Sequence, residues 1–401
     1  MRQALAGLRV LDFCWVGAGA LVTKILAEHG AEVIKIESHA RPDNLRLAPP
    51  YRSGAEGLDG SGYFASRNND KKSVTLNMQT DKGRKLALSL ATRADIVANN
   101  FRPGVMERWG LGYDTVAGAN PSVVYLSMPM QGSDGPNSAY IGFGSTIAAL
   151  AGLVHLSGDP DRTPVGTGTH YPDHIPSPGH ALVALLAAVR RRNRTGEGAL
   201  VELSQLESAA SVVGPALVAA GNGGPEPTRS GNRVGGHCPS GVFPCRGDDE
   251  WCAIAVRNDN EWQALAQVLA LEDDPSFATV AGRREHEDEV ERAISSRTQT
   301  WERHELAAAL QAAHVPASPV QSSSDLLEDP HLAARDFWRR LSHPVIGAMT
   351  TPSAPFRHDG DRTGPERSAP LLGEHTREIA SSLLGLSDDE IDKLEAEHVL
   401  W

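Results

Sequence analysis

The sequence predicts an α/β protein, with a doubly wound, mostly parallel sheet covered by helices on both faces and a smaller α+β domain. Three observations lead to this fold class. The first forty residues alternate strand, helix and strand, the alternation returns between residues 73 and 127, and 401 residues are enough for two or three domains. Because strands joined by a crossover helix run parallel, the repeated pattern predicts a parallel sheet.

The predicted elements of this sheet follow one another in chain order. Leu21, Ile25 and Leu26 have helical spacing, and Gly30 stands where that helix would end. Another helix is expected over 82–93. Short β-rich runs predict strands at 8–13, 31–37, 73–76, 95–98, 123–127 and 199–203.

A longer helix is expected over about 178–192. Ser177 is a natural N-cap for it, and Pro178 suits the first helical position. Arginines at 190–192 and 194 complement the negative end of the helix, and Gly196 would terminate it.

The second half of the chain has a different pattern of predicted elements. Residues 221–227 are rich in Gly and Pro and form the best linker candidate. Residues 241–256 read as two strands around a turn at 246–249, followed by helical patterns to about residue 313. Near the end, residues 387–390 form a capping box that opens a final helix.

Composition excludes several classes of protein. The chain has 38 basic and 50 acidic side chains, a net charge of −12, which argues against a nucleic-acid binder. The longest apolar run, 181–189, is far shorter than the ~20 residues that span a bilayer, and the first residues lack the apolar core of a signal peptide. The four cysteines form no Cys-x-x-Cys pair, so we expect a cytoplasmic protein without a metal site.

Two loops carry the features of a ligand site. The loop 16–22 follows a predicted strand, but Val22 stands where a dinucleotide-binding fingerprint needs a glycine. We therefore expect a ligand-facing loop that does not bind NAD in the usual way; the alternative is a tight turn that needs small residues. A basic set, Lys71, Lys72, Arg102 and Arg108, would suit a phosphate-bearing cofactor, and the alternative is ordinary solvated charge. Arg102 directly follows a predicted strand, where parallel sheets bind ligands.

Asp173 is the strongest candidate for a catalytic residue. It lies just before the predicted helix, whose positive end would keep the carboxylate ionised and available as a nucleophile. An Asp in that place is most often a helix cap. Ser177 is better placed for capping, so Asp173 is left without a structural reason.

Taken together, the motifs resemble those of the class III CoA-transferases, which include formyl-CoA:oxalate, carnitine and benzylsuccinate CoA-transferases. The resemblance covers nearly the whole chain and its motifs occur in the family's order. They lie at 5–13, 30–37, 68–76, 100–105, 134–136, 231–233, 315–317, 328–331 and 371–376.

The resemblance implies a function and a site. Asp173 falls on the family's catalytic aspartate, which carries CoA from an acyl-CoA donor to a carboxylic acid acceptor through an anhydride and an aspartyl-CoA thioester. Gly235 and Gly236 resemble part of a glycine-rich loop that covers the intermediates. The residues expected to hold coenzyme A are Val16, Gly17, Lys71, Lys72, Asn100, Phe101, Arg102 and Arg108.

The resemblance also implies an architecture. Residues 1–206 and 333–401 would form a large Rossmann-like CoA-binding domain from both termini, 207–234 a linker, and 235–332 the small α+β domain. Two ring-like chains would interlock as a dimer. A homodimer is expected, and a heteromer of two unlike chains is the alternative.

Three departures from the family pattern bear on function. Many relatives have an acid where Gly144 stands, and the oxalate enzymes have a glutamine where Gly17 stands. The fold also hosts α-methylacyl-CoA racemases, whose histidine would fall at Phe143. Phenylalanine cannot exchange a proton, although His170 or His174 could substitute from elsewhere in the chain. We therefore favour CoA transfer over racemisation. A CoA-binding subunit without activity is a third reading, which the presence of Asp173 disfavours.

Overall fold

The computed structural model describes residues 3–52 and 54–401, which form two compact units. The first unit comprises the described residues of Met1–Leu153, Thr167–Gly224 and His331–Trp401, and the second comprises Val154–Gly166 and Pro225–Pro330. The first unit therefore draws on both halves of the chain. Its boundaries differ from the expected ones at 154–166, which belong to the second unit, and at 207–224, which belong to the first.

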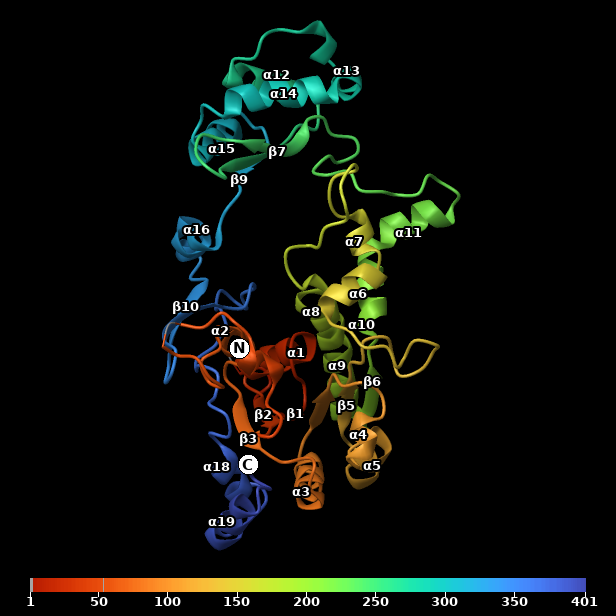
Figure 1. Ribbon diagram of the computed structural model, residues 1–401, viewed down its shortest axis with the longest axis vertical. Helices are drawn as coiled ribbons and strands as arrows, with labels where there is room; N and C mark the ends of the chain where they lie inside the picture. Colours follow the sequence, from red (N-terminus) through yellow and green to blue (C-terminus); the bar gives the residue numbers. More distant parts are fainter. Residues whose placement is uncertain (1–2, 53) are drawn as a thin grey trace. The chain divides into compact units, whose positions relative to one another are not determined.

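The first unit is built on a six-stranded sheet in which all paired strands are parallel (Figure 1). The order across the sheet is β3-β2-β1-β4-β5-β6. The expected strands and their parallel pairing are therefore confirmed. The strands are β1 Arg9–Asp12, β2 Glu32–Glu37, β3 Lys72–Thr75, β4 Ile96–Asn99, β5 Val124–Ser127 and β6 Ala199–Glu202.

Helices cover both faces of this sheet because successive strand residues point to opposite sides. Val10, Ile96 and Val124 are in register and pack with α1 and α9. Their neighbours Leu11, Val97 and Tyr125 belong to a separate cluster with α3, α5, α18 and α19 on the other face. The strands read as nearly continuous apolar runs for this reason.

The helices and the hairpin of the first unit complete its architecture. Ser387 caps the last helix through the expected capping box. The helices are α1 Ala18–Glu28, α2 Gly62–Arg67, α3 Asp81–Ala91, α4 Val105–Arg108, α5 Tyr113–Ala119, α6 Gly144–Leu150, α8 Tyr171–His174, α9 Pro176–Thr195, α10 Gln205–Ala210, α11 Gly214–Gly221, α18 Thr376–Ser382 and α19 Asp388–Ala396. An unpredicted antiparallel hairpin joins β10 Trp338–His343 and β11 Gly347–Pro352, and the short 3₁₀ turns are η1 Asn44–Leu47 and η2 Ser211–Val213.

Part of the linker expected over 207–234 is helical, in agreement with the helix-like stretch that the sequence predicts up to about residue 220. α10 and α11 occupy most of 205–221, and Ala209 of α10 is buried in one cluster with Ile147 and Ala151. Small apolar residues allow this close packing of α10. The glycines and prolines farther along the chain do not indicate it.

The start of α9 differs from the sequence expectation. The helix begins at Pro176, with Ile175 in the N-cap position, because the one-turn helix α8 ends directly before it. Ser177 therefore lies inside the first turn, and its buried hydroxyl has no hydrogen-bond partner among the described residues. The prediction that Ser177 caps the helix is wrong. Gly196 ends the helix in a left-handed conformation, as expected.

The second unit has a three-stranded antiparallel sheet in the order β7-β8-β9. The two strands expected around the 246–249 turn are β7 and β8, and β9 was not predicted. Its elements are β7 Ser240–Pro244, β8 Trp251–Ala255, α12 Asp259–Leu269, η3 Pro275–Phe277, α13 Val280–Glu285, α14 Glu287–Thr298, α15 Arg303–Ala312, β9 Ala317–Pro319 and α16 Ser323–Glu328. Two short helices, α7 Leu153–Leu156 and α17 Pro330–Ala334, lie where the chain passes between the units.

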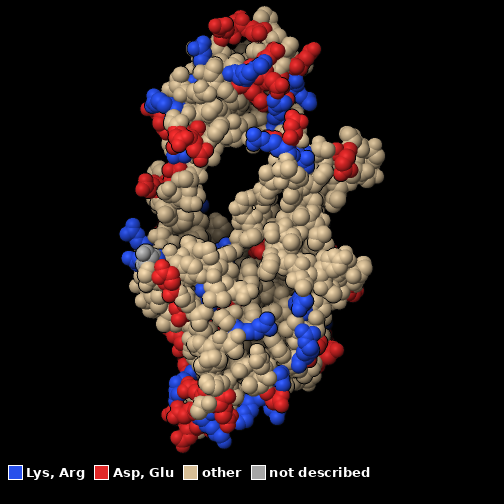
Figure 2. Space-filling view, in the orientation of Figure 1, with Lys and Arg blue, Asp and Glu red and all other residues tan. Residues whose placement is uncertain are grey.

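Charge and apolar surface are unevenly distributed. On the face shown in Figure 2, acidic and basic side chains are interspersed around α3, α18 and α19, whereas the surface around α6 and α10 carries few charges.

None of the helices in the described part of the chain is long and apolar enough to cross a bilayer. The four cysteines are buried and unpaired, and within residues 3–52 and 54–401 no three His, Cys, Asp or Glu side chains group as a metal site requires.

Candidate functional site

The strand order of the large sheet reverses beside β1, whose neighbours are β2 and β4. The loops that follow two adjacent parallel strands diverge at such a point and leave a crevice at their carboxyl ends. A cavity of 150 Å³ lies here. Its walls come from the loops after β1 and β4, the chain before α6, α8 and α10; the lining residues are Trp15, Val16, Gly17, Ala18, Asn100, Arg102, Met130, Tyr140, Ile141, Gly142, Phe143, Gly144, Ile147, Asp173 and Gln205.

Two glycines make room for Asp173 in this cavity. Asp173 lies in α8 and is only 7% exposed. A Cβ atom added to Gly17 would lie 2.8 Å from the Cβ of Asp173, and one added to Gly144 would lie 2.5 Å from its Oδ2. Any side chain at either position would therefore collide with the catalytic candidate. Both positions depart from the family pattern, and at both of them the absence of a side chain leaves the space that Asp173 occupies.

Burial raises the pKa of Asp173 to about 6, while the charge of His170, a hydrogen bond from the Gly144 N–H and the charge of Arg67 act in the opposite direction. The sequence interpretation was that the positive end of the following helix keeps this carboxylate ionised. Instead the contacting amide comes from the start of α6, and desolvation is the largest effect. Because the pKa still lies below 7, the carboxylate is mostly ionised at neutral pH.

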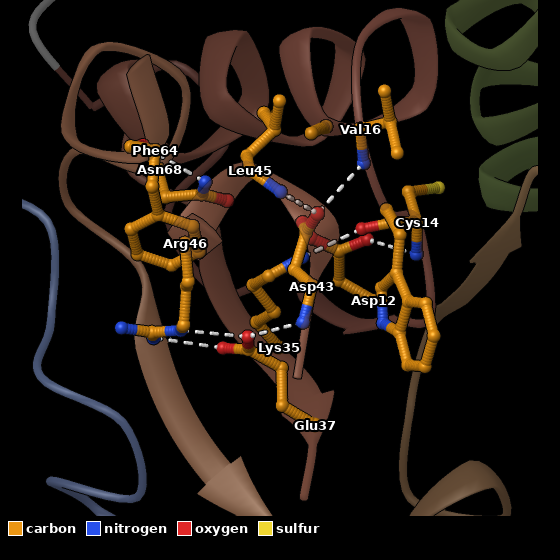
Figure 3. A network of polar contacts seen from close by, with 12 residues as sticks. Asp12, Cys14, Val16, Lys35, Glu37, Asp43, Leu45, Arg46, Phe64 and Asn68 are labelled. Carbon is orange, nitrogen blue, oxygen red and sulfur yellow. Dashed lines mark hydrogen bonds and ion pairs between the residues drawn. The ribbon is translucent and has the colours of Figure 1, made fainter. Parts of the chain in front are cut away.

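The loop that carries Gly17 is held in a strained conformation by buried charges (Figure 3). Val16 has a φ of 64°, which is unfavourable for a β-branched residue. Its N–H donates to Asp43 Oδ1 at 3.0 Å, and Lys35 Nζ pairs with Asp43 Oδ2 at 2.9 Å. Lys35 also donates to the carbonyl of Cys14 at 2.7 Å. This network fixes the backbone of Val16 and Gly17 against the cavity.

Asn100 holds the same loop from the other side. Its side-chain amide accepts from the N–H of Trp15 at 2.9 Å and donates to the carbonyl of Trp15 at 2.6 Å. Phe101 packs edge-on between Trp15 and Trp109, with ring centroids 5.2 and 5.4 Å away, and does not line the cavity. Arg102 is exposed and lines the cavity. Asn100 and Phe101 are uncharged, so Arg102 is the residue of the three that could bind an anionic group of a ligand.

Lys71 and Lys72, which the sequence interpretation assigns to coenzyme A binding, do not line the cavity. Lys71 is buried, and its ammonium pairs with Asp12 at 3.0 Å and donates to Ala20, Thr23 and Asn68. Lys72 begins β3, at the amino end of a parallel strand, and pairs with Glu32 and Glu378 at 2.9 and 2.7 Å. Both charges are compensated within the chain, and the expected contact of these lysines with coenzyme A stays a prediction.

The remaining expected ligand residues lie outside the cavity wall. Arg108 is the last residue of α4 and is exposed. Gly235 and Gly236 belong to the second unit, so their expected role as a cover for the intermediates stays a prediction.

Sequence reasoning considered His174 as an acid–base group but missed its contact with Tyr63 beside Asp173. The hydroxyl of Tyr63, on α2, lies 3.3 Å from His174 Nε2, and Thr169 Oγ1 lies 3.0 Å from His174 Nδ1. Burial, together with the charges of Arg67 and His170, lowers the pKa of His174 to about 4, so the ring is neutral at pH 7. Tyr63 and His174 are 111 positions apart, so no local spacing predicts their contact.

Comparison with known proteins agrees with this geometry. The profile described as CoA-transferase family III matches residues 5–376. The chain belongs to CoA-transferase family III. This finding confirms the resemblance and the prediction that the chain is an enzyme of this class.

Individual members of the family cover the chain almost completely. A probable CoA-transferase of Mycobacterium tuberculosis is 35% identical over 98% of this chain, which spans only 50% of that relative's length. A succinyl-CoA–D-citramalate CoA-transferase of Chloroflexus aurantiacus is 31% identical over 99% of this chain and 98% of its own. The crystal structure of a CaiB/BaiF family protein from Brucella suis has a TM-score of 0.88 at 28% identity, over 96% of this chain and 100% of that one.

Proposed function

We propose that the chain moves CoA from an acyl-CoA donor to a carboxylic acid acceptor, with Asp173 as the nucleophile. The observation that carries the proposal is the position of Asp173. Among the described residues that line the cavity it is the single carboxylate, and it stands between Gly17 and Gly144 with no salt-bridge partner.

The transfer consists of four balanced steps. A carboxylate oxygen of Asp173 attacks the thioester carbon of the donor, the C–S bond breaks with CoA leaving as a thiolate, and a mixed anhydride of Asp173 and the donor acid is formed. The thiolate then attacks Cγ of Asp173 and expels the donor acid as a carboxylate, which leaves an aspartyl-CoA thioester. The acceptor carboxylate attacks this Cγ and releases the thiolate again. Attack of the thiolate on the acceptor's acyl carbon gives the new acyl-CoA and restores the Asp173 carboxylate.

The surroundings of Asp173 suit these steps. A carboxylate with a pKa near 6 is a stronger nucleophile than an ordinary aspartate and is still ionised at pH 7. The hydrogen bond from the Gly144 N–H holds one orientation of the carboxylate. No side chain at position 17 or 144 shields it from the thioester.

Coenzyme A is the substrate that the cavity mouth would hold in this proposal. Arg102 is the exposed cation on the wall and supplies a partner for phosphate. The backbone of Val16 and Gly17, fixed by Asp43, faces the reacting thioester. Asn100 acts by holding Trp15 rather than by touching the ligand with its amide.

Racemisation of 2-methylacyl-CoA is the alternative reaction. It needs a group to remove the α-proton and another to return it. The described lining of the cavity contains no histidine, and Phe143 carries no exchangeable proton. His174 has both ring nitrogens within hydrogen-bond distance of hydroxyls. These features favour transfer, and incubation of a single epimer in deuterated water tests the choice, because deuterium at the α-carbon would support racemisation.

Trapping the covalent intermediate tests the proposed function directly. Donor acyl-CoA is supplied without acceptor, the adduct is trapped with hydroxylamine or borohydride, and the labelled peptide is identified by mass spectrometry. Succinyl-CoA is the first donor, since one relative is named for it. We expect the label on Asp173, and a fall in turnover by orders of magnitude in Asp173→Asn with CoA binding retained.

The matched control is Asp114→Asn, which removes an exposed carboxylate of the same unit. It should transfer CoA at the wild-type rate. Full activity in Asp173→Asn, or a label confined to another residue, would reject the mechanism.

We further propose that the chain acts as a dimer. Large apolar side chains are exposed on the first unit: Ile141 is 74%, Val183 72% and Val218 62% exposed. Burial in an interface would remove this apolar surface from water. Light scattering coupled to size exclusion should give twice the chain mass of 42.8 kDa, and a monomer at micromolar concentration would contradict the proposal.

A further inference from the structure

Arg67 is a half-buried cation without a counter-charge. It is the last residue of α2, and its Nε is buried with no hydrogen-bond partner. Within the described residues its guanidinium makes no ion pair, and its one recorded contact is with the ring of Tyr63, 5.6 Å from the centroid. An uncompensated guanidinium in such surroundings is costly, so this position calls for an explanation.

Four other buried cations in the described part of the same unit each contact a carboxylate, and a fifth, Arg362, donates to the carbonyl oxygen of Ala354. Nitrogen–oxygen distances are 2.6 Å for Lys24–Glu28, 2.9 Å for Lys35–Asp43, 2.8 Å for Arg46–Glu37 and 3.0 Å for Lys71–Asp12. Each of these five buried cations therefore has an oxygen partner within the unit, whereas among the described residues Arg67 has none. A carboxylate supplied from outside the chain would complete the same arrangement.

A chain of contacts leads from Arg67 to the nucleophile. Arg67 and Tyr63 are four residues apart on α2, so they lie on the same face of the helix. The hydroxyl of Tyr63 contacts His174, which directly follows Asp173 in α8. The charge of Arg67 also acts on Asp173, where burial is the larger influence on the pKa. These contacts place the guanidinium of Arg67 on the face of α2 from which Tyr63 reaches α8, the helix that carries Asp173.

We propose that Arg67 binds a second carboxylate at the far end of the substrate's acyl chain, so that the enzyme prefers dicarboxylic acids and their mono-CoA esters. This inference rests on the proposed function, because it assumes that the acyl group is attached at Asp173. Arg67 would recognise the distal carboxylate by charge-assisted hydrogen bonds. Arg67 is a specificity-determining residue in this view and takes no part in bond breaking.

The test compares acyl groups that differ only in the distal charge. Donors are succinyl-CoA, its distal methyl ester and butyryl-CoA, and the readout is kcat/KM for CoA release with label on Asp173. We expect the wild type to prefer succinyl-CoA over both uncharged donors by about 10²-fold. In Arg67→Gln the rate with succinyl-CoA should fall by a similar factor, mainly through KM, while the rate with butyryl-CoA changes by less than about threefold.

Two further variants complete the design. Arg67→Lys keeps the charge but not the bidentate geometry and should recover part of the preference. Arg190→Gln removes an exposed arginine of α9 and should leave every rate unchanged. If Arg67→Gln does not fold, the wild-type comparison of succinyl-CoA with its methyl ester still decides the question.

The outcomes separate the two proposals. Label on Asp173 without any preference for the charged donor, or an equal loss on all donors in Arg67→Gln, overturns the inference and leaves the proposed function standing. An equal loss would mean that Arg67 only tunes Asp173, and a shifted pH profile for every donor would accompany it. Absence of label on Asp173 with any donor overturns the proposed function itself.

Discussion

Replacing Asp173 by Asn should stabilise the protein at neutral pH, even though it removes the nucleophile. The pKa of this carboxyl rises from 3.8 to about 6 on folding because the side chain is buried. An acid whose pKa is raised on folding lowers the free energy of unfolding at every pH at which the unfolded chain is ionised, here from about pH 4 upward. The free energy of unfolding reaches its full reduction above the pKa of the folded state. At ~1.4 kcal/mol per pKa unit the cost at pH 8 is about 3 kcal/mol, and at pH 5 it is roughly half of that.

The assay is urea unfolding of the wild type and Asp173→Asn at pH 8, 5 and 4. Asn keeps the size of the side chain and an oxygen to accept the Gly144 N–H, so the neutral variant should be more stable by about 3 kcal/mol at pH 8. The gain should shrink toward pH 4, where the folded carboxyl is protonated and the unfolded one is only partly ionised. Asp114→Asn, at an exposed site, should show a difference within about 0.5 kcal/mol throughout. A gain that does not depend on pH, or a loss at pH 8, would refute the argument that desolvation dominates at Asp173.

Three other predictions follow from the same geometry. With Asp173 as nucleophile, kcat/KM for the donor should fall about tenfold per pH unit below a pKa near 6; a flat profile between pH 5 and 7 would contradict this. Gly144→Ala should lower turnover at least about 10²-fold in a folded protein because its Cβ would lie 2.5 Å from Asp173 Oδ2, whereas Gly179→Ala, which meets nothing within 4 Å, should be fully active. Asp43→Asn should cost about 3 kcal/mol in a denaturation experiment, because Lys35 loses a buried carboxylate partner and faces an amide NH2 if Oδ1 keeps its bond to the Val16 N–H. The exposed pair Lys82–Glu397 is the comparison, and Lys82→Met should cost less than about 1 kcal/mol.

The strands and most of the first helices could be predicted from the sequence because their signals are local. Apolar runs such as 96–99 and 124–127 alternate with helical spacing, and a glycine or a capping residue marks several ends. The start of α9 could not be predicted this way. Ser177 has the composition of a cap, but the preceding turn of α8 leaves Ile175 in that position.

The candidate site shows the same division. Asp173 was identified from the sequence because it follows the family's pattern and has no capping role. Its burial, the clearance left by Gly17 and Gly144, and the neighbourhood of Tyr63 and Arg67 came only from the tertiary structure.

The basic residues illustrate the physical reason. In the sequence, Lys71 and Arg102 are both basic residues near predicted strands. In the structure, Lys71 is buried in an ion pair with Asp12, 59 positions away, whereas Arg102 is exposed at the cavity. Hydropathy and spacing determine which segments become strands and helices, since these depend on neighbours in the chain. Desolvation and charge pairing depend on groups that folding brings within a few ångströms from distant segments, and for that reason the tertiary structure alone decided which charges are free to act.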